Sequence, residues 1–361
     1  MSARQGPARR GLGQRARRTI QRRQATAVVV VLALIGAIGL LSAALRGGNE
    51  PEPSTSAPIE APGRSTILLL SVTGGKQAML AAVGAGGGRE AAALILPPGI
   101  TVVAPGQAEA TTEQVQALPG PSMRIAASNA LGAWADHYAV SDLSHLGALI
   151  DRTAPITVNL PEAVTIAGRV LGPGETPMSG SDVVGYLTPK AADADLRWQR
   201  VLEGFLRDGA PVQPGDLTEA DDPAGVGSVL EQARGATVTV LPSHVVTGTV
   251  AIPDQPAWDG LVVQTFGTTK PIPAQVQNGN GLTGMGESVA ERIVPLGFRV
   301  VLSGNADNFD HATTSVVANG GEHSTEAQAV LHALGVGAVS VSPVTSGVAD
   351  ITIVVGKDFT G

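Results

Sequence analysis

Residues 276–289 read VQNGNGLTGMGESV, and this stretch decides how the C-terminal part of the chain folds. It lies between a predicted strand at 274–278 and a predicted helix at 284–296. Three of its four glycines have the spacing of a dinucleotide-binding loop: Gly279, Gly281 and Gly284. The stretch is therefore either a nucleotide site or a glycine-rich turn with another use.

A dinucleotide loop also needs an acidic residue about 20 positions later, at the end of the second strand, to bind the ribose. The next predicted strand, 298–304, ends in polar residues that are not acidic, and Asp307 follows only in a loop. We therefore interpret the stretch as a turn without a nucleotide. Asn278 and Asn280 are expected to tolerate left-handed conformations there. Backbone amides at the helix start could still hold an anion.

The elements that follow complete a small layered domain. We expect strands at 313–319, 338–344 and 350–356, and a helix at 324–335. Ser324 with Thr325 is expected to cap this helix, with Glu326 in its first turn. The sequence thus predicts a βαββαβ-type unit of about 90 residues, a common domain size.

Strands and helices also mix in the preceding 200 or so residues, a length sufficient for its own core. Strands are expected at 65–72, 91–103, 154–160, 163–171 and 236–246, and helices at 122–135, 141–152, 193–206 and 222–235. Ser141 or Asp142 can serve as the N-cap of the second of these helices. The mixture indicates an α/β or α+β layered fold.

The N-terminus predicts attachment to a membrane. Residues 1–24 carry eight arginines and no acid, and the 21 residues 25–45 are uncharged and mostly apolar. As a helix, the apolar run would be about 32 Å long, enough to cross a hydrocarbon core. The arginines place the tail in the cytoplasm and the bulk of the chain outside the cell membrane. Residues 46–64 are a Pro/Ser-rich linker. Two alternatives remain: a cleaved signal peptide, and a core helix behind a DNA-binding tail.

Composition excludes several classes of function. The first 46 residues hold nine of the 24 basic residues, so 15 basic residues face all 31 acids in the remainder. Such an acidic surface with 3% aromatic residues argues against nucleic acid as a partner. The chain has no cysteine, and its six histidines form no metal-binding pair, so we expect no metal site.

Several separate motifs of the C-terminal stretch resemble the LytR C-terminal domain over residues 272–361. They are the Asn278-Gly279 turn, the Gly297-Phe298 pair that starts a strand, and the closing run 356–359, GKDF. The resemblance implies an accessory domain of bacterial envelope proteins with no established chemistry.

Residues 65–270 resemble a LytR-CpsA-Psr (LCP) domain in outline, in the stretches 136–151 and 171–187. That resemblance implies an enzyme outside the membrane that moves glycopolymer from a polyprenyl-pyrophosphate carrier onto peptidoglycan. Arginines and aspartates of the family handle pyrophosphate and Mg²⁺. An arginine fork suits phosphate oxygens, and a divalent ion neutralises the leaving group.

This chain departs from the family at the three places that should carry the chemistry. After the first strand Lys76 is the only charge, the run Pro97-Pro98-Gly99 replaces a Pro-Arg-Asp motif, and Ala194 replaces a helix arginine. Lys cannot reproduce the bidentate clamp of Arg. Candidate catalytic residues are therefore Arg197, Asp193 and Asp195, and candidate ligand-binding residues are Lys76, Arg197 and Gln199. The favoured alternative for Arg197 is a surface cation paired with an acidic neighbour such as Asp193.

The sequence thus predicts an extracytoplasmic envelope protein that is not a transferase. Its expected partners are the bilayer and a cell-wall glycopolymer, peptidoglycan or an active LCP transferase. The alternative is a divergent but active phosphotransferase, and only then is Mg²⁺ expected. Transcription regulation, which some names in the family suggest, does not fit an apolar N-terminal segment and acidic outer domains.

Overall fold

A computed structural model describes residues 63–74, 78–106, 109–152, 154–189, 191–247, 250–344 and 347–361. All of them belong to one unit spanning residues 58–361. The predicted basic tail (1–24), membrane helix (25–45), most of the linker (46–64) and Lys76 lie outside the described residues. Within the described ranges, no helix combines the length and the apolar character that a bilayer span requires.

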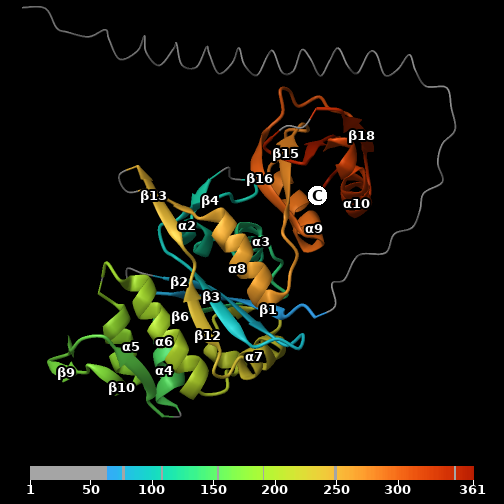
Figure 1. The fold of residues 1–361 in the computed structure, drawn as a ribbon. Helices are drawn as coiled ribbons and strands as arrows, with labels where there is room; N and C mark the ends of the chain where they lie inside the picture. The colour runs from blue at the N-terminus through green and yellow to red at the C-terminus, as the bar shows by residue number, and fades with distance from the viewer. Residues whose placement is uncertain are drawn as a thin grey trace, which may run out of the picture. The chain divides into compact units, whose positions relative to one another are not determined.

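A six-stranded mixed sheet forms the centre of the first part of the chain, in the order β11-β6-β1-β2-β3-β12 (Figure 1). Its strands are β1 (Thr66–Thr73), β2 (Met79–Ala85), β3 (Ala92–Leu96), β6 (His137–Asp142), β11 (Glu219–Ala220) and β12 (Thr237–Val240). β1 runs antiparallel to β2 and parallel to β6, and β12 runs parallel to β3. β1, β2 and β3 pair in chain order, whereas β6 and β12 join the sheet from distant parts of the sequence.

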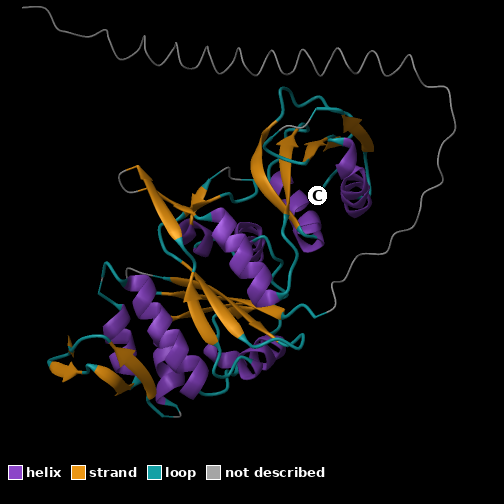
Figure 2. Cartoon of the chain, viewed as in Figure 1, coloured by secondary structure: helices purple, strands orange, loops and turns teal. Residues whose placement is uncertain are grey.

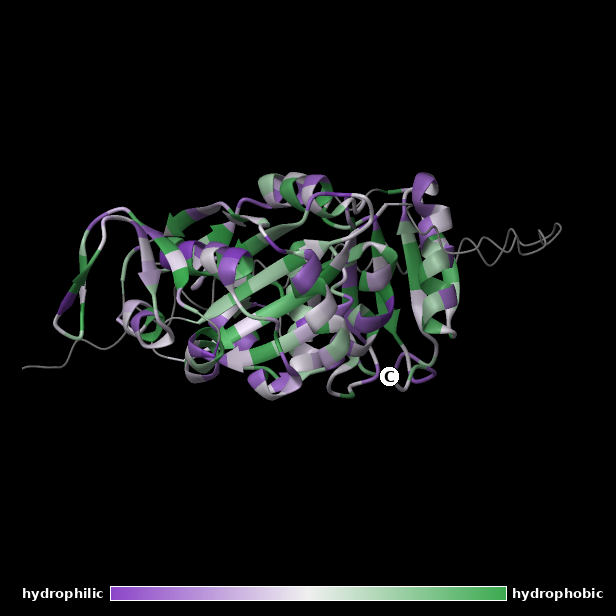
Figure 3. Cartoon of the chain, turned by 90° about the horizontal axis from the view of Figure 1, so that it is seen from below, coloured by the Kyte–Doolittle hydropathy of each residue, from purple (hydrophilic) through white to green (hydrophobic). Residues whose placement is uncertain are grey.

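Helices cover both faces of this sheet (Figures 1 and 2). One face carries α2 (Thr112–Gln116), α3 (Gly120–Leu131) and α8 (Gln255–Phe266). The other carries α4 (Leu143–Asp151), α5 (Gly180–Leu187), α6 (Ala194–Asp208) and α7 (Pro223–Gln232). The reason lies in the strands: Ile67 and Leu69 of β1 enter one core, whereas Leu68 and Leu70 enter the other. Both sides of the strand are therefore apolar, and the strands in the centre of Figure 3 are mostly hydrophobic.

Four two-stranded pairs surround the layers. They are β4 (Thr101–Val102) with β5 (Ala110–Thr111), β7 (Ile156–Leu160) with β10 (Gly174–Met178), β8 (Val164–Ile166) with β9 (Arg169–Leu171), and β13 (Ser243–Thr247) with β14 (Val250–Pro253). A 3-10 helix, η1 (Pro214–Asp216), follows α6 and contacts α4.

The C-terminal part forms a second, five-stranded sheet in the order β16-β15-β19-β17-β18. Its elements are β15 (Ile272–Asn278), α9 (Met285–Ile293), η2 (Val294–Leu296), β16 (Phe298–Asn305), β17 (Ser315–Asn319), η3 (Gly321–His323), α10 (Ser324–Leu334), β18 (Ala338–Ser342) and β19 (Ile351–Val355). All five predicted strands are found, but the chain order is βαββαββ, not βαββαβ. The last strand, β19, takes the centre of the sheet, parallel to β15 and antiparallel to β17.

The two sheet-containing parts are in contact through α3 and β16. The Oδ1 atom of Asn129 accepts a hydrogen bond of 2.7 Å from the backbone N–H of Val300. Its Nδ2 donates to the carbonyl oxygens of Val300, at 2.9 Å, and Val103, at 3.1 Å. Asn129 is 1% exposed, so one buried amide joins the second sheet to the first part of the chain.

Some local predictions were right and others were wrong. Asp142 is the N-cap of α4, as expected, and its Oδ1 accepts from the N–H groups of Ser144 and His145. The cap predicted at Ser324 is wrong: η3 leads directly into α10, and His323 occupies the N-cap position without a side-chain capping hydrogen bond. The strand predicted at 236–246 is divided between β12 and β13, because Pro242 has no N–H to donate to a ladder.

Candidate functional site

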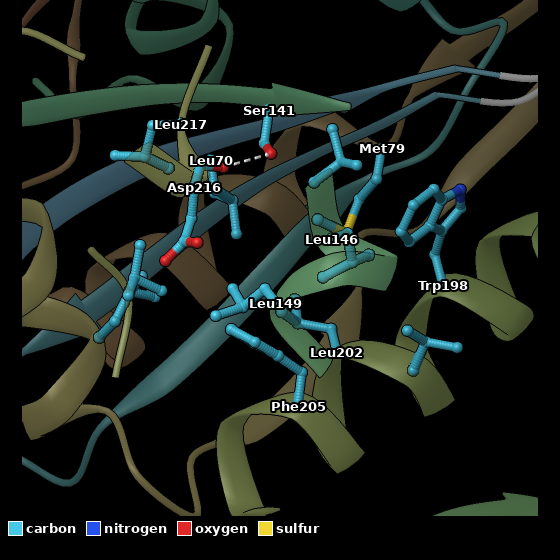
Figure 4. Close-up of a pocket in the computed structure, with 14 residues that line it drawn as sticks. Leu70, Met79, Ser141, Leu146, Leu149, Trp198, Leu202, Phe205, Asp216 and Leu217 are labelled. Atoms are coloured by element: carbon cyan, nitrogen blue, oxygen red, sulfur yellow. Dashed lines mark hydrogen bonds between the residues drawn. The ribbon is translucent and has the colours of Figure 1, made fainter. Parts of the chain in front are cut away.

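A partly open apolar pocket lies between the first sheet and helices α4, α6 and α7 (Figure 4). Its cavity volume is about 40 Å³. The fourteen residues that line it are Leu70, Val72, Met79, Ser141, Leu146, Leu149, Trp198, Val201, Leu202, Phe205, Val212, Asp216, Leu217 and Leu230. Only Ser141 and Asp216 are polar, so the walls present almost nothing but hydrocarbon and one indole ring.

Apolar residues at helical spacing in α6 form one wall of this pocket. Trp198, Val201, Leu202 and Phe205 recur on one side of α6, and each is at least 94% buried. The opposite side of the helix is charged, and Arg207 lies in the last turn, where the helix dipole favours a cation. The amphipathic pattern thus turns one wall of the pocket toward β1 and β2.

The polar residues of the pocket lie together at one end. Ser141 Oγ donates a hydrogen bond of 3.0 Å to the carbonyl oxygen of Asp216. The carboxylate of Asp216 accepts two bonds from Arg152, of 2.6 and 2.8 Å, and a third of 2.7 Å from the N–H of Gln213. Arg152 holds the pKa of Asp216 below its ordinary value, against the opposing effect of burial. This end of the pocket is therefore a neutralised ion pair rather than a free cation.

Arg197, the strongest sequence candidate, is held by its own neighbours. Its Nε donates to Asp193 Oδ1 at 3.0 Å, and its Nη1 donates to the carbonyl oxygen of Tyr186 at 3.0 Å. The guanidinium also lies 4.9 Å from the centre of the Tyr186 ring. The structure therefore brings Arg197 and Asp193 together as an i,i+4 pair at the start of α6.

Arg200 joins this group, and the sequence analysis missed it. Its Nη1 donates to the hydroxyl of Tyr186 at 3.2 Å and lies 3.6 Å from Asp193 Oδ2. The signal was available, because residues 193, 197 and 200 recur at helical spacing on one face. Asp193 thus faces two arginines, and two guanidinium groups surround one tyrosine.

The remaining candidates have separate environments. Gln199 Nε2 donates to the carbonyl of Val238 on β12, at 2.8 Å, and to Glu203 Oε1, at 3.2 Å. Asp195 lies in the first turn of α6, where its Oδ1 accepts from the N–H of Leu196. Lys76 lies outside the described residues. Gln199 therefore links α6 to the sheet. Ligand binding by Gln199 and Lys76 and catalysis by Asp195 stay predictions.

The glycine turn of the second sheet differs from the expectation in one respect. Gly281 and Gly284 have positive φ angles of 77° and 84°, but Asn278 and Asn280 do not adopt left-handed conformations. Asn278 Oδ1 instead accepts from the N–H groups of residues 280 and 281, and its Nδ2 donates to the carbonyl of Leu282. The short asparagine side chains therefore fix the turn by hydrogen bonds, while glycine alone supplies the left-handed backbone.

The second asparagine ties the turn to the end of the chain. Asn280 Nδ2 donates to the carbonyl oxygens of Gly356 and Phe359, at 3.1 Å each. This explains why the asparagine-glycine turn and the closing run of residues 356–359 occur together in the sequence. Across the described ranges, no group of three His, Asp or Glu side chains is arranged to hold a metal ion.

Comparison with known proteins gives one family match. Residues 272–359 match the model of the LytR_C family, described as LytR cell envelope-related transcriptional attenuator. No curated protein sequence matches the chain.

Solved structures of LCP proteins are similar to part of the chain. TagV of B. subtilis has 11% identity and a TM-score of 0.48, covering 57% of this chain and 99% of its own. TagT bound to LI-WTA has 16% identity and a TM-score of 0.48, with 62% and 98% covered. The LytR-Csp2A-Psr enzyme of Actinomyces oris has 18% identity and a TM-score of 0.44, with 59% and 93% covered. Identities and scores this low support no conclusion about activity.

The resemblance of the C-terminal stretch to the LytR C-terminal domain is thus confirmed, over nearly the predicted range. The C-terminal sheet and its two helices, residues 272–359, are a domain of the LytR_C family.

Proposed function

We propose that the first part of the chain binds the hydrocarbon chain of a lipid-like ligand, such as an isoprenoid, without transferring the group attached to it. The observation that carries the proposal is the pocket itself. Twelve of its fourteen lining residues are apolar, and it lies between the sheet and a helical wall. An apolar lining with few polar groups is the usual character of a site for an apolar ligand. Because the cavity is only about 40 Å³, a hydrocarbon chain enters it when the helical wall moves away from the sheet.

The state of the arginines supports the second half of the proposal. Arg152 is bidentate on Asp216, and Arg197 and Arg200 share Asp193 and the two oxygens of Tyr186. To bind a diphosphate, these guanidinium groups would have to break their existing bonds to carboxylates and to a carbonyl oxygen. The transition state of phosphoryl transfer is stabilised by preorganised cations, which are not free in this arrangement.

The setting of this activity is the cell envelope. The apolar segment 25–45 would hold the chain in a membrane with its bulk outside the cytoplasm, and the C-terminal domain belongs to a family described as cell envelope-related. A protein that holds a lipid-linked precursor there would present it to a peptidoglycan-bound or transferase partner. In this role the protein influences the attachment of the precursor to peptidoglycan, and a separate enzyme catalyses that attachment.

Native mass spectrometry of the full-length chain with a polyprenyl phosphate tests lipid binding. Leu217 lines the pocket and is only half-buried, so the larger side chain of Leu217→Trp can enter the cavity without strain deep in the core. We expect Leu217→Trp to weaken lipid binding about tenfold or more, a change of about 1.4 kcal/mol. Val170→Trp is the control, because Val170 is 67% exposed and lies outside the pocket.

The proposal predicts bound lipid for the unchanged protein and for Val170→Trp. Equal binding by Leu217→Trp, or no bound lipid in any sample, would contradict it.

A further inference from the structure

A loop of the LytR_C domain lies across the glycine turn. Within this loop, Ala306 donates to the carbonyl of Asn278 at 2.8 Å, and the N–H of His311 donates to the carbonyl of Gly279 at 3.2 Å. A Cβ on Gly279 would lie 2.7 Å from the ring of His311, and one on Gly281 would lie 3.2 Å from Cγ of Phe309. Because these glycines have no side chain, the loop can pack closely against the turn.

Phe309 lies in this loop, close to Gly281, and its side chain is exposed to solvent. It is 46% exposed, and it is the only exposed residue among the ten aromatic residues of the chain, all of which the structure describes. Leu282, next to Gly281, is 53% exposed, and the backbone of Leu282 is fixed by Asn278 and Asn280. An aromatic ring and an alkyl side chain are thus presented on a backbone that hydrogen bonds make rigid.

Polar side chains flank Phe309 in its loop. His311 Nε2 lies 3.2 Å from Asp307 Oδ1, and Lys357 Nζ lies 3.2 Å from Asp310 Oδ1. Asn308 donates to Asp307. Each of these groups is partly exposed, and Asp310 is 90% exposed, so their remaining hydrogen-bonding capacity faces water.

We propose that Phe309 and Leu282 form the floor of a binding site for a pyranose ring of an uncharged glycan. The C–H groups of a pyranose pack on an aromatic face, while its hydroxyl and N-acetyl groups bond to surrounding carboxylates, amides and imidazoles. A rigid aromatic side chain bordered by such groups meets both requirements.

Other occupants fit this surface less well. Asp307 and Asp310 flank the ring in sequence, and Lys357 is already paired with Asp310, so the loop offers no basic cluster to anionic lipid headgroups, nucleic acid or anionic wall polymers. A stable protein partner covers about 800 Å² on each side, far more than two exposed apolar side chains supply. The site is separate from the apolar pocket, so the inference does not depend on lipid binding there.

Saturation-transfer NMR tests the inference with the full-length chain in a detergent without a sugar headgroup. The probe is the N-acetylglucosamine tetramer, and a galacturonic acid tetramer is the anionic comparison. We expect saturation of the first probe only, and a loss of about three- to tenfold in affinity for Phe309→Ala. Phe309→Trp should retain binding, and Val170→Ala, on an exposed strand elsewhere, should not change it.

Three results would each overturn the inference. They are absence of saturation of the neutral tetramer by the unchanged protein, undiminished saturation with Phe309→Ala in a chain whose thermal unfolding is unaltered, and equal saturation of the anionic tetramer.

Discussion

Arg299 on β16 and Asp259 on α8 form an ion pair of 2.7 Å although their side chains are only 8% and 13% exposed. Arg299 is the only charged residue in the five strands of its sheet. Burial lowers the pKa of Arg299, and Asp259 opposes that effect. Because the two residues belong to different sheet-containing parts, the pair joins the LytR_C domain to α8 of the first part.

Removal of Asp259 should destabilise the protein strongly. Asp259→Ala leaves a buried guanidinium without its partner, a change that costs about 3–5 kcal/mol in free energy of unfolding. The double change Arg299→Met with Asp259→Leu removes both charges and should recover most of that loss. Urea unfolding followed by circular dichroism measures both. A loss below about 1 kcal/mol for Asp259→Ala, the level of an exposed pair, would show that the pair is solvated.

The amide of Asn129 should matter for the same junction. Asn129→Ala leaves the buried N–H and carbonyl of Val300 without partners, at a cost of about 2–3 kcal/mol. Hydrogen exchange at the Val300 amide should accelerate by the corresponding factor. Asn308→Ala, in an exposed loop, is the matched control and should change stability by less than about 0.5 kcal/mol. Unchanged exchange at Val300 would contradict the bond.

Two glycines of the turn should respond differently to alanine. Gly284 has a φ of 84° and open space around it, so Gly284→Ala costs only backbone strain of about 1 kcal/mol. A Cβ on Gly279 would lie 2.8 Å from the carbonyl oxygen of Val355 in the central strand, which cannot move aside, so Gly279→Ala should cost about 2–3 kcal/mol. Thermal unfolding compares the two variants. A larger loss of stability for Gly284→Ala than for Gly279→Ala would contradict the close packing around Gly279.

The stability of the protein should fall in acid. Hydrogen bonds from the hydroxyl of Ser144 and the N–H of His145 lower the pKa of Asp142, and Arg152 lowers that of Asp216. A carboxyl with a lowered pKa in the folded state binds fewer protons than in the unfolded chain. Its contribution is therefore present above the unfolded pKa of about 4 and is lost as the pH falls below that value.

The variant Asp216→Asn separates this effect from general acid unfolding. It should be less stable than the unchanged protein at pH 7 and should lose less stability between pH 5 and pH 2. Urea unfolding at a series of pH values provides the comparison, and identical slopes for the two proteins would refute the assignment to Asp216.

The LytR_C domain could be predicted almost completely, because its strands and helices have strong periodicity and its turns are marked by glycine. The first part was harder. β2, with the sequence MLAAVGA, has no alternation and is followed directly by a glycine, and α8 has a proline as its second residue. Both are specified by packing between the layers, which a single sequence does not display.

The candidate site was predicted in part for a similar reason. The pairing of Arg197 with Asp193 follows from helical spacing, and the sequence analysis considered it. The pocket does not follow from spacing, since Met79, Ser141, Trp198 and Asp216 come from four separate segments. The same holds for Phe309, whose exposure depends on a loop folded back over the glycine turn.

The central claim is that the first part of the chain holds a lipid-linked ligand and does not transfer it. The most direct measurement gives the full-length protein a polyprenyl-pyrophosphate-linked glycan, Mg²⁺ and peptidoglycan, and records release of polyprenyl phosphate together with the amount of bound lipid. The account predicts bound lipid and no release above the level without protein. Release that disappears in Arg197→Ala, in a variant that still binds the lipid, would contradict it.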